Sequence, residues 1–159
     1  MIIYGIDNFE QDMEDIIELC STWWEDSLFF KTYGVEYNVN QDMFKNLKQA
    51  NLLIYTIGRD INKQIISCYV GVKSPYMFNA NVLSCNEIVW CIYKEQRNFR
   101  NLVGLMNAIE DLMFKENIIL WNLNVSNESA YNSTGDFLER KGYTFMDKCY
   151  SKQKENGNG

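Results

Sequence analysis

The chain has 159 residues, with 15 Lys and Arg against 21 Asp and Glu, five Cys, one Pro and no His. Without histidine it cannot form a Ser–His–Asp triad, a Cys–His pair or a His-ligated zinc site, so its chemistry must use carboxylates, tyrosines, thiols or backbone groups. A net charge of −6 and a pI near 4.7 suit a phosphate backbone poorly. We therefore expect no nucleic-acid partner and favour a cationic one.

The length and the 47% hydrophobic content predict one domain over residues 1–150, followed by a flexible tail at 151–159. No apolar run reaches the ~18 residues of a membrane span, so no membrane partner is expected. The cysteines are widely spaced without a C-x-x-C pair, and no secretory n-region opens the chain. These features predict reduced thiols in a cytoplasmic protein.

The first third of the chain predicts a strand and two helices. Residues 1–5 are short and apolar, which favours a strand. Asn8 has the position of an N-cap, and the apolar residues after it recur at helical spacing, so we expect a helix over about 9–25. An aromatic-rich connector follows, and Asn40 is expected to cap a short second helix.

The middle of the chain predicts three strands. Residues 52–57 and 64–72 are apolar runs joined by a turn-rich link, which indicates an antiparallel hairpin. A third long strand is expected over 82–93. Simple alternation along this strand places Cys85, Glu87, Val89 and Cys91 on one face and Ile88, Trp90 and Ile92 on the other.

The second half alternates between helical and strand patterns. We expect a helix over 102–114, a strand over 118–125, a helix over 130–141 that Gly142 ends, and a last strand over 143–150. The predicted order is β-α-α-β-β-β-α-β-α-β. The strand–helix–strand crossover implies a central parallel strand pair, in a mixed, mostly antiparallel sheet flanked by helices, which is an α/β (α+β) fold class.

The segment between the third strand and the next helix carries the most suggestive residues. It reads WCIYKEQRNFRNLVGLM over residues 90–106. A turn that enters a helix offers unpaired N–H groups at the positive end of the helix dipole, and Arg97 and Arg100 add positive charge there. The segment therefore predicts an anion site. An ordinary turn solvated by two arginines is the alternative.

This segment resembles the central motif of the GNAT superfamily of acetyl-CoA-dependent N-acyltransferases, L-x-V-x-P-E-x-R-G-x-G-x-G-x-x-L-[LM], at matching spacing. Downstream, the FLERKGY sequence at 137–143 is similar to the family's [FY]-L-x-x-x-G-[FY]. The element order matches over nearly the whole chain, most specifically at 84–106 and 118–145. The resemblance implies acetyl-CoA as the cofactor and acetyl transfer to a primary amine.

The resemblance also assigns the cofactor contacts. It places the pyrophosphate at the turn formed by Arg97, Asn98, Arg100, Asn101, Leu102 and Val103. It places the thioester carbonyl at backbone N–H groups of Cys91 and Ile92, and the pantetheine or phosphate arm near Asn127. Arg100 and Leu102 stand where the family has two small residues, and side chains there restrict the approach of a pyrophosphate to the backbone. Direct contact between Arg100 and a phosphate is the alternative.

Two residues are candidates for proton transfer by the same resemblance. Glu87 occupies the strand region where many members keep a glutamate that acts as the general base. An apolar setting would raise the pKa of Glu87. A glutamate that faces solvent or pairs with a lysine is the alternative. Tyr131 is the candidate acid for the leaving thiolate, because the family's usual tyrosine position is Leu138 here.

The acceptor side is implied to lie at the N-terminal helices and their connector. Trp24, Phe29 and Tyr33 are interleaved there with acidic residues, which suits a cationic amine through cation–π contacts. Core packing is the alternative explanation for these aromatics. The cysteines are expected to be small core hydrophobes, and no metal site is expected.

These residues together predict an N-acetyltransferase that moves an acetyl group from acetyl-CoA to a primary amine, either a small cationic amine or a protein or peptide amine. The alternative is a catalytically degenerate GNAT-fold binding or structural protein, such as a viral accessory or virion component, which Arg100 and Leu102 favour. The Asn-rich, compact chain fits a phage-like origin, with a location in the host cytoplasm. The aromatic content leaves room for a homodimer face.

Overall fold

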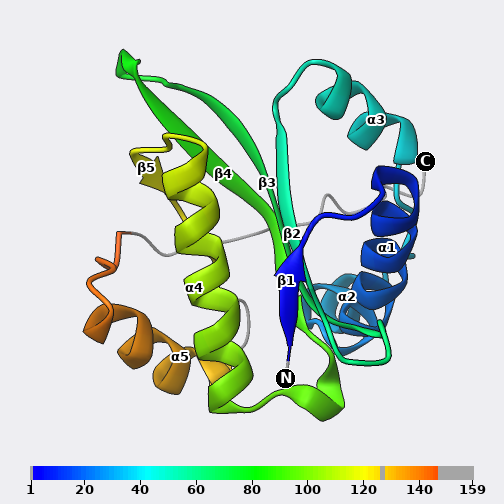
Figure 1. Ribbon diagram of the computed structural model, residues 1–159. Helices are drawn as coiled ribbons and strands as arrows, with labels where there is room; N and C mark the ends of the chain where they lie inside the picture. Colours follow the sequence, from blue (N-terminus) through cyan, green and yellow to red (C-terminus); the bar gives the residue numbers. More distant parts are fainter. Residues whose placement is uncertain (1, 126–127, 147–159) are drawn as a thin grey trace, which may run out of the picture. The chain divides into compact units, whose positions relative to one another are not determined.

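Figure 1 shows the computed structural model, which describes residues 2–125 and 128–146, with the backbone alone at 28, 29 and 128–132. The chain divides into two compact units, Met1–Glu25 with Tyr37–Asn124 and Asp26–Glu36 with Val125–Gly159. The first unit contains the whole sheet of the described residues, and each unit is considered by itself.

The N-terminal part of the first unit follows the predicted pattern. It contains β1 (Ile3–Gly5), α1 (Phe9–Asp26) and α3 (Gln41–Gln49). The side-chain oxygen of Asn8 accepts a hydrogen bond from the Gln11 N–H at 3.2 Å, as the expected N-cap of α1. Asn40 caps α3 in the same way, by accepting from the Met43 N–H at 3.2 Å.

The sheet of the first unit has the order β1-β2-β3-β4-β5. Its other strands are β2 (Leu53–Arg59), β3 (Ile65–Tyr76), β4 (Asn79–Ile92) and β5 (Leu120–Trp121). Neighbours from β1 to β4 pair antiparallel, whereas β4 and β5 pair parallel. The expected mixed sheet with one parallel pair is confirmed, although β5 is much shorter than the predicted strand over 118–125.

Helices cover both faces of this sheet (Figure 1). One face packs against α1 and α3 and forms a core that includes Ile16, Leu19, Phe44, Ile57 and Val70. The crossover helix α4 (Phe99–Lys115) follows a short 3₁₀ turn at Lys94–Gln96 and covers the other face with four fully buried side chains. These are Leu105, Met106, Ile109 and Met113. Their helical spacing gives α4 the apolar stripe that the sequence predicted.

A buried ion network joins α1 to the sheet. The Asp12 side chain is 0% exposed. Its carboxylate accepts hydrogen bonds from the Asp7 N–H at 3.0 Å, the Tyr55 hydroxyl at 3.1 Å and the Arg59 guanidinium at 2.8 Å. The same guanidinium donates to Asp15 at 2.7 Å. Each buried charge therefore has an opposite charge and hydrogen-bond partners, as burial requires.

The second unit contains α2 (Leu28–Tyr33) and α5 (Glu128–Arg140). Helix α2 replaces part of the predicted connector; Ser27 caps it by accepting from the Phe30 N–H at 3.1 Å, and Gly34 ends it with a φ of 64°. Gly142 has a φ of 94° after α5, which confirms the expected helix stop.

The expected last strand does not begin within the described residues. Residues 143–146 form no strand, so the start of the expected last strand over 143–150 is wrong, and 147–150 lie outside the described residues.

None of the helices in the described ranges is both long and apolar enough to span a bilayer. Cys20, Cys68, Cys85 and Cys91 are buried and free thiols.

Candidate active site

Glu87 lies at a β-bulge of β4. Val89 pairs with Val70 across the ladder, and Glu87 pairs with the next residue of β3, Gly71, so Ile88 is the extra residue on β4. An extra residue shifts the alternation of side chains by one position. Odd-numbered side chains of β4 before Ile88 therefore point to one face of the sheet, and those after Ile88 point to the other.

The expectation that Cys85, Glu87, Val89 and Cys91 share one face is wrong for this reason. Val89 and Cys91 face the core beneath α1. Cys85 lies on the other face, where its Sγ is 3.2 Å from the Tyr69 hydroxyl. Glu87 is two residues further along the same side of the bulge, so it lies on this second face as well.

Beyond Cys85, β4 and β5 stop pairing through their backbones. The last backbone contact is a long one, from the Asn122 N–H to the Cys85 carbonyl at 3.4 Å. Side chains then bridge the two segments. The Glu87 N–H donates to the Asn122 side-chain oxygen at 3.3 Å, the Asn124 N–H donates to the Glu87 carboxylate at 2.5 Å, and the Trp90 indole N–H donates to the Asn124 carbonyl at 2.8 Å.

The carboxyl group of Glu87 is half-buried at this divergence. Burial raises the pKa of Glu87 to about 7, and hydrogen bonds from Asn124 and Trp90 counteract part of the rise. A carboxyl group with this pKa is present in both protonation states near neutral pH. It can therefore accept and return a proton, which is the property a general base requires.

The backbone of Ile92 faces the side of β4 from which β5 has diverged. The Tyr93 N–H donates to the Ile66 carbonyl of β3 at 2.7 Å. Bond direction alternates along an antiparallel strand, so the N–H and carbonyl of Ile92 point away from β3. The Nε of Arg97 donates to that carbonyl at 3.1 Å, which fixes the arginine at the end of the strand.

The turn into α4 is held by its own asparagines. The Asn98 side-chain oxygen caps the helix by accepting from the Asn101 N–H at 3.0 Å. The side-chain amides of Asn98 and Asn101 both donate to the Gln96 carbonyl, at 3.0 and 2.8 Å. The first turn of α4 is where the sequence predicted an anion site. One N–H group of this turn, that of Asn101, is already used by the Asn98 cap.

Arg100 and Leu102 lie inside the first turns of α4, in regular helix. The residues with positive φ in the described part of the chain lie elsewhere, so neither position needs a glycine for its backbone conformation. The side chain of Arg100 is exposed, and those of Leu102 and Val103 are half-buried. The positive charges of Arg97 and Arg100 therefore stand at the N-terminus of a helix whose backbone is ordinary.

The other predicted site residues lie on elements of both units. Trp24 lies on α1, with its ring centroid 6.3 Å from that of Tyr37. Phe29 and Tyr33 belong to α2 in the second unit, so a lining shared with Trp24 stays a prediction. Tyr131 lies on α5, and Asn127 lies outside the described residues. Cys91 points into the core, where its Sγ is 3.6 Å from that of Cys68.

Three residues of the divergence were not predicted as site residues. Trp90 was assigned to the opposite face from Glu87, because simple alternation ignores the bulge. Asn122 and Asn124 lie two residues apart in the predicted strand over 118–125, where the sequence assigned a site role to neither of them. Two amide side chains at strand spacing are the one signal that pointed to a polar edge there.

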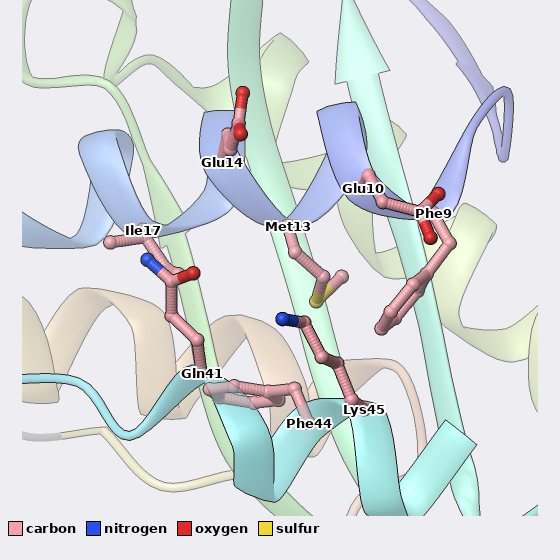
Figure 2. Close-up of a pocket in the computed structure, with 8 residues that line it drawn as sticks. All are labelled: Phe9, Glu10, Met13, Glu14, Ile17, Gln41, Phe44 and Lys45. Carbon is pink, nitrogen blue, oxygen red and sulfur yellow. The ribbon is translucent and has the colours of Figure 1, made fainter. Parts of the chain in front are cut away.

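A separate hollow of about 110 Å³ lies between α1 and α3 (Figure 2). Met13 and Phe44 form an apolar floor, Glu10 and Glu14 lie on the α1 side, and Lys45 lies on the α3 side. These helices cover the face of the sheet opposite Glu87. The hollow is therefore not part of the divergence between β4 and β5.

No protein-family model matches the sequence, and no curated protein is significantly similar to it. Solved structures do match its fold. A glucosamine-6-phosphate N-acetyltransferase from Arabidopsis thaliana has a TM-score of 0.69 at 10% identity, covering 96% of this chain and 98% of the other. A Trypanosoma brucei acetyltransferase has a TM-score of 0.68 at 9% identity, covering 96% and 99%.

An aminoglycoside acetyltransferase from an uncultured soil metagenomic sample, in complex with sisomicin, has a TM-score of 0.68 at 8% identity. The match covers 97% of this chain and 94% of the other. At such identities the likeness concerns the fold. The chain thus has the fold of the GNAT acetyltransferases, as the motif at 90–106 implied.

Proposed function

We propose that the chain is an N-acetyltransferase that transfers an acetyl group from acetyl-CoA to a primary amine. The observation that carries the proposal is the half-buried Glu87 at the divergence of β4 and β5, with its pKa raised to about 7. A base is needed because an ammonium group cannot attack a carbonyl carbon until it loses a proton. The shared fold of known acetyltransferases supports the same activity.

The residues around Glu87 fit a thioester cofactor at both of its ends. Arg97 and Arg100 stand at the N-terminus of α4, where positive charge and the helix dipole favour phosphate groups. The Ile92 backbone points to the open side of β4, where it would hold the carbonyl oxygen. When bound, acetyl-CoA supplies an activated acyl group. Glu87 takes the proton of the amine, directly or through one water molecule, and releases it to solvent.

The acceptor is proposed to be a cationic amine. The net charge of −6 attracts cations over long distances and favours their encounter with the protein. Trp24, Phe29 and Tyr33 remain the proposed lining residues, because aromatic faces hold ammonium groups through cation–π contacts. A small amine and a protein or peptide amine both satisfy this chemistry.

A second candidate function rests on the same divergence. The N–H and carbonyl of Asn124 are engaged by the chain's own Glu87 and Trp90, and the Asn98 cap occupies an N–H of the α4 turn. A chain that closes these groups internally has less to offer a cofactor. This observation favours a non-catalytic binding or structural protein built on the GNAT fold.

Acetyl-CoA binding and turnover separate the two candidates. A ligand at 100 times its Kd adds about 2.7 kcal/mol of stability, so acetyl-CoA at millimolar concentration should raise the Tm clearly. Glu87→Gln should keep this shift and lower turnover about 100-fold or more, because the base is lost while the cofactor contacts stay. Asp111→Asn, an exposed change on α4, is the matched control and should leave both unchanged.

Other outcomes of these experiments would contradict parts of the proposal. No Tm shift with acetyl-CoA or CoA would favour the non-catalytic protein. A shift with equal turnover in the wild type and Glu87→Gln would remove Glu87 as the base. Trp90→Phe loses the indole N–H but keeps an aromatic ring, so a larger shift in this variant alone would show that Trp90 obstructs the cofactor.

A further inference from the structure

Three thiols converge inside the core of the first unit. Cys20 comes from α1, Cys68 from β3 and Cys91 from β4. The Sγ of Cys91 is 3.6 Å from that of Cys68 and 3.9 Å from that of Cys20, and all three sulfurs lie within 4.8 Å of one another. We call this group the thiol cluster. Its members lie far apart in the sequence, so their spacing gave no sign of it.

The separations suit a single ion at the centre. Three sulfurs bound at about 2.3 Å in a trigonal arrangement lie about 4.0 Å from one another. The distances of 3.6 and 3.9 Å therefore need little adjustment for the sulfurs to share one metal ion. Because the thiols lie on a helix and on two paired strands, the surrounding secondary structure holds the three donors in place.

The donor set and its surroundings select the class of ion. No histidine exists in the chain, and the cluster found among the described residues contains sulfur donors alone. The side chains are only 7%, 0% and 4% exposed, which disfavours water as a fourth ligand. Zn²⁺ in structural sites takes four ligands, whereas thiolates suit the soft ion Cu⁺.

We propose that the thiol cluster of Cys20, Cys68 and Cys91 is a binding site for one soft monovalent metal ion, Cu⁺. The ion binds to the three sulfurs, and each thiol that becomes a thiolate releases its proton to solvent. The site ties α1 to β3 and β4. The thiol cluster is independent of acetyl transfer, because its sulfurs face the core opposite Glu87.

The test uses the full chain in a Cys149→Ser background, reduced and without oxygen. Cu⁺ is supplied as its acetonitrile complex in competition with a chromophoric Cu⁺ chelator. The expected result is retention of one copper ion per chain with a raised Tm, because a ligand of the native state stabilises it. Cys20→Ala should lose the copper, since removal of one sulfur leaves an incomplete site.

Cys85→Ser is the matched control, because Cys85 is a buried thiol of the same strand outside the cluster. It should retain the copper. Cys68→Ala is a second test variant, and the thermal unfolding of each variant without metal verifies that it folds. Loss of all copper to the chelator by the parent protein would overturn the proposal. The proposal would also be overturned if Cys20→Ala and Cys68→Ala retained as much copper as the parent protein, or if the parent took up Zn²⁺ in preference to Cu⁺.

Discussion

Glu87 and Trp90 replace a stretch of backbone pairing between β4 and β5 with side-chain hydrogen bonds to Asn124. The carboxyl group thus lies where the two strands no longer exchange backbone bonds, half-buried and with a pKa raised to about 7. The proposed proton transfer and the local shape of the sheet edge therefore depend on the same side chain.

The raised pKa makes stability depend on pH through Glu87. Its pKa rises from an ordinary value of 4.5 to about 7 on folding. Between these values the folded protein holds a proton that the unfolded chain has lost, so this group's contribution to the free energy of unfolding falls as pH rises through that range and levels off above it. Glu87→Gln should lack about 1 kcal/mol of this fall, because water reaches part of the carboxyl group.

Urea unfolding of the wild type and Glu87→Gln, at the two ends of this pH range, measures the effect. Asp111→Asn, an exposed change on α4, is the matched control and should behave like the wild type. An identical pH dependence in the wild type and Glu87→Gln would contradict the raised pKa.

The sequence identified Glu87 as the candidate base but not its surroundings. Motif spacing could place Glu87 on a strand that leads into an Arg-bearing turn. It could not locate Trp90 and Asn124 beside it, because their positions depend on one extra residue at Ile88. A bulge changes side-chain direction without changing composition, so alternation alone misassigns every residue on one side of it.

Among the elements, the long amphipathic ones were predictable and the short ones were not. Helices α1 and α4 carry apolar residues at helical spacing over several turns, and their bounds agree closely with the expected ranges. Helix α2 has six residues, too few for that periodicity, and depends on its Ser27 cap and Gly34 stop. Strand β5 is cut to Leu120–Trp121 because β4 turns away from it.

Gly71, opposite Glu87 at the bulge, tests how tightly this part of the sheet is packed. A Cβ atom at position 71 would lie 2.5 Å from the Cys85 Sγ and 2.6 Å from the Tyr69 hydroxyl. Gly71→Ala should therefore lower the free energy of unfolding by about 1–3 kcal/mol, since neighbouring buried side chains must move.

Gly135→Ala is the matched comparison, because nothing lies within 4 Å of a Cβ atom there and the residue is inside α5. This variant should gain about 0.5–1 kcal/mol from helix propensity. Urea denaturation of both variants measures the difference, and equal changes at the two positions would contradict the tight contact at Gly71.

At the scale of the folded chain, distant segments of the first unit are joined by the buried network around Asp12. Arg59 and Asp12 are 47 residues apart in sequence and lie on β2 and α1. Neither the pairing nor its burial could be predicted from sequence, because an aspartate at the start of a helix is typical of a solvent-exposed position.

Asp12→Asn should lower the free energy of unfolding by about 3 kcal/mol, because it removes a buried charge and leaves the partly buried Arg59 with reduced charge compensation. Asp42→Asn is the control, since its ion pair with Lys45 is exposed and should contribute less than about 1 kcal/mol. Thermal and urea unfolding measure both. A loss at Asp12 as small as that at Asp42 would show that Asp15 and Asp7 together compensate Arg59.

The extra residue at Ile88 also gives one strand two separate chemical environments. Glu87 and Cys91 are only four positions apart, yet the bulge turns the carboxyl group to one layer of the molecule and the thiol to the other. The backbone of the sheet lies between the carboxyl group and the thiol, so the two groups have separate neighbours. A strand with unbroken alternation would have turned the acid and the thiol to the same face of the sheet.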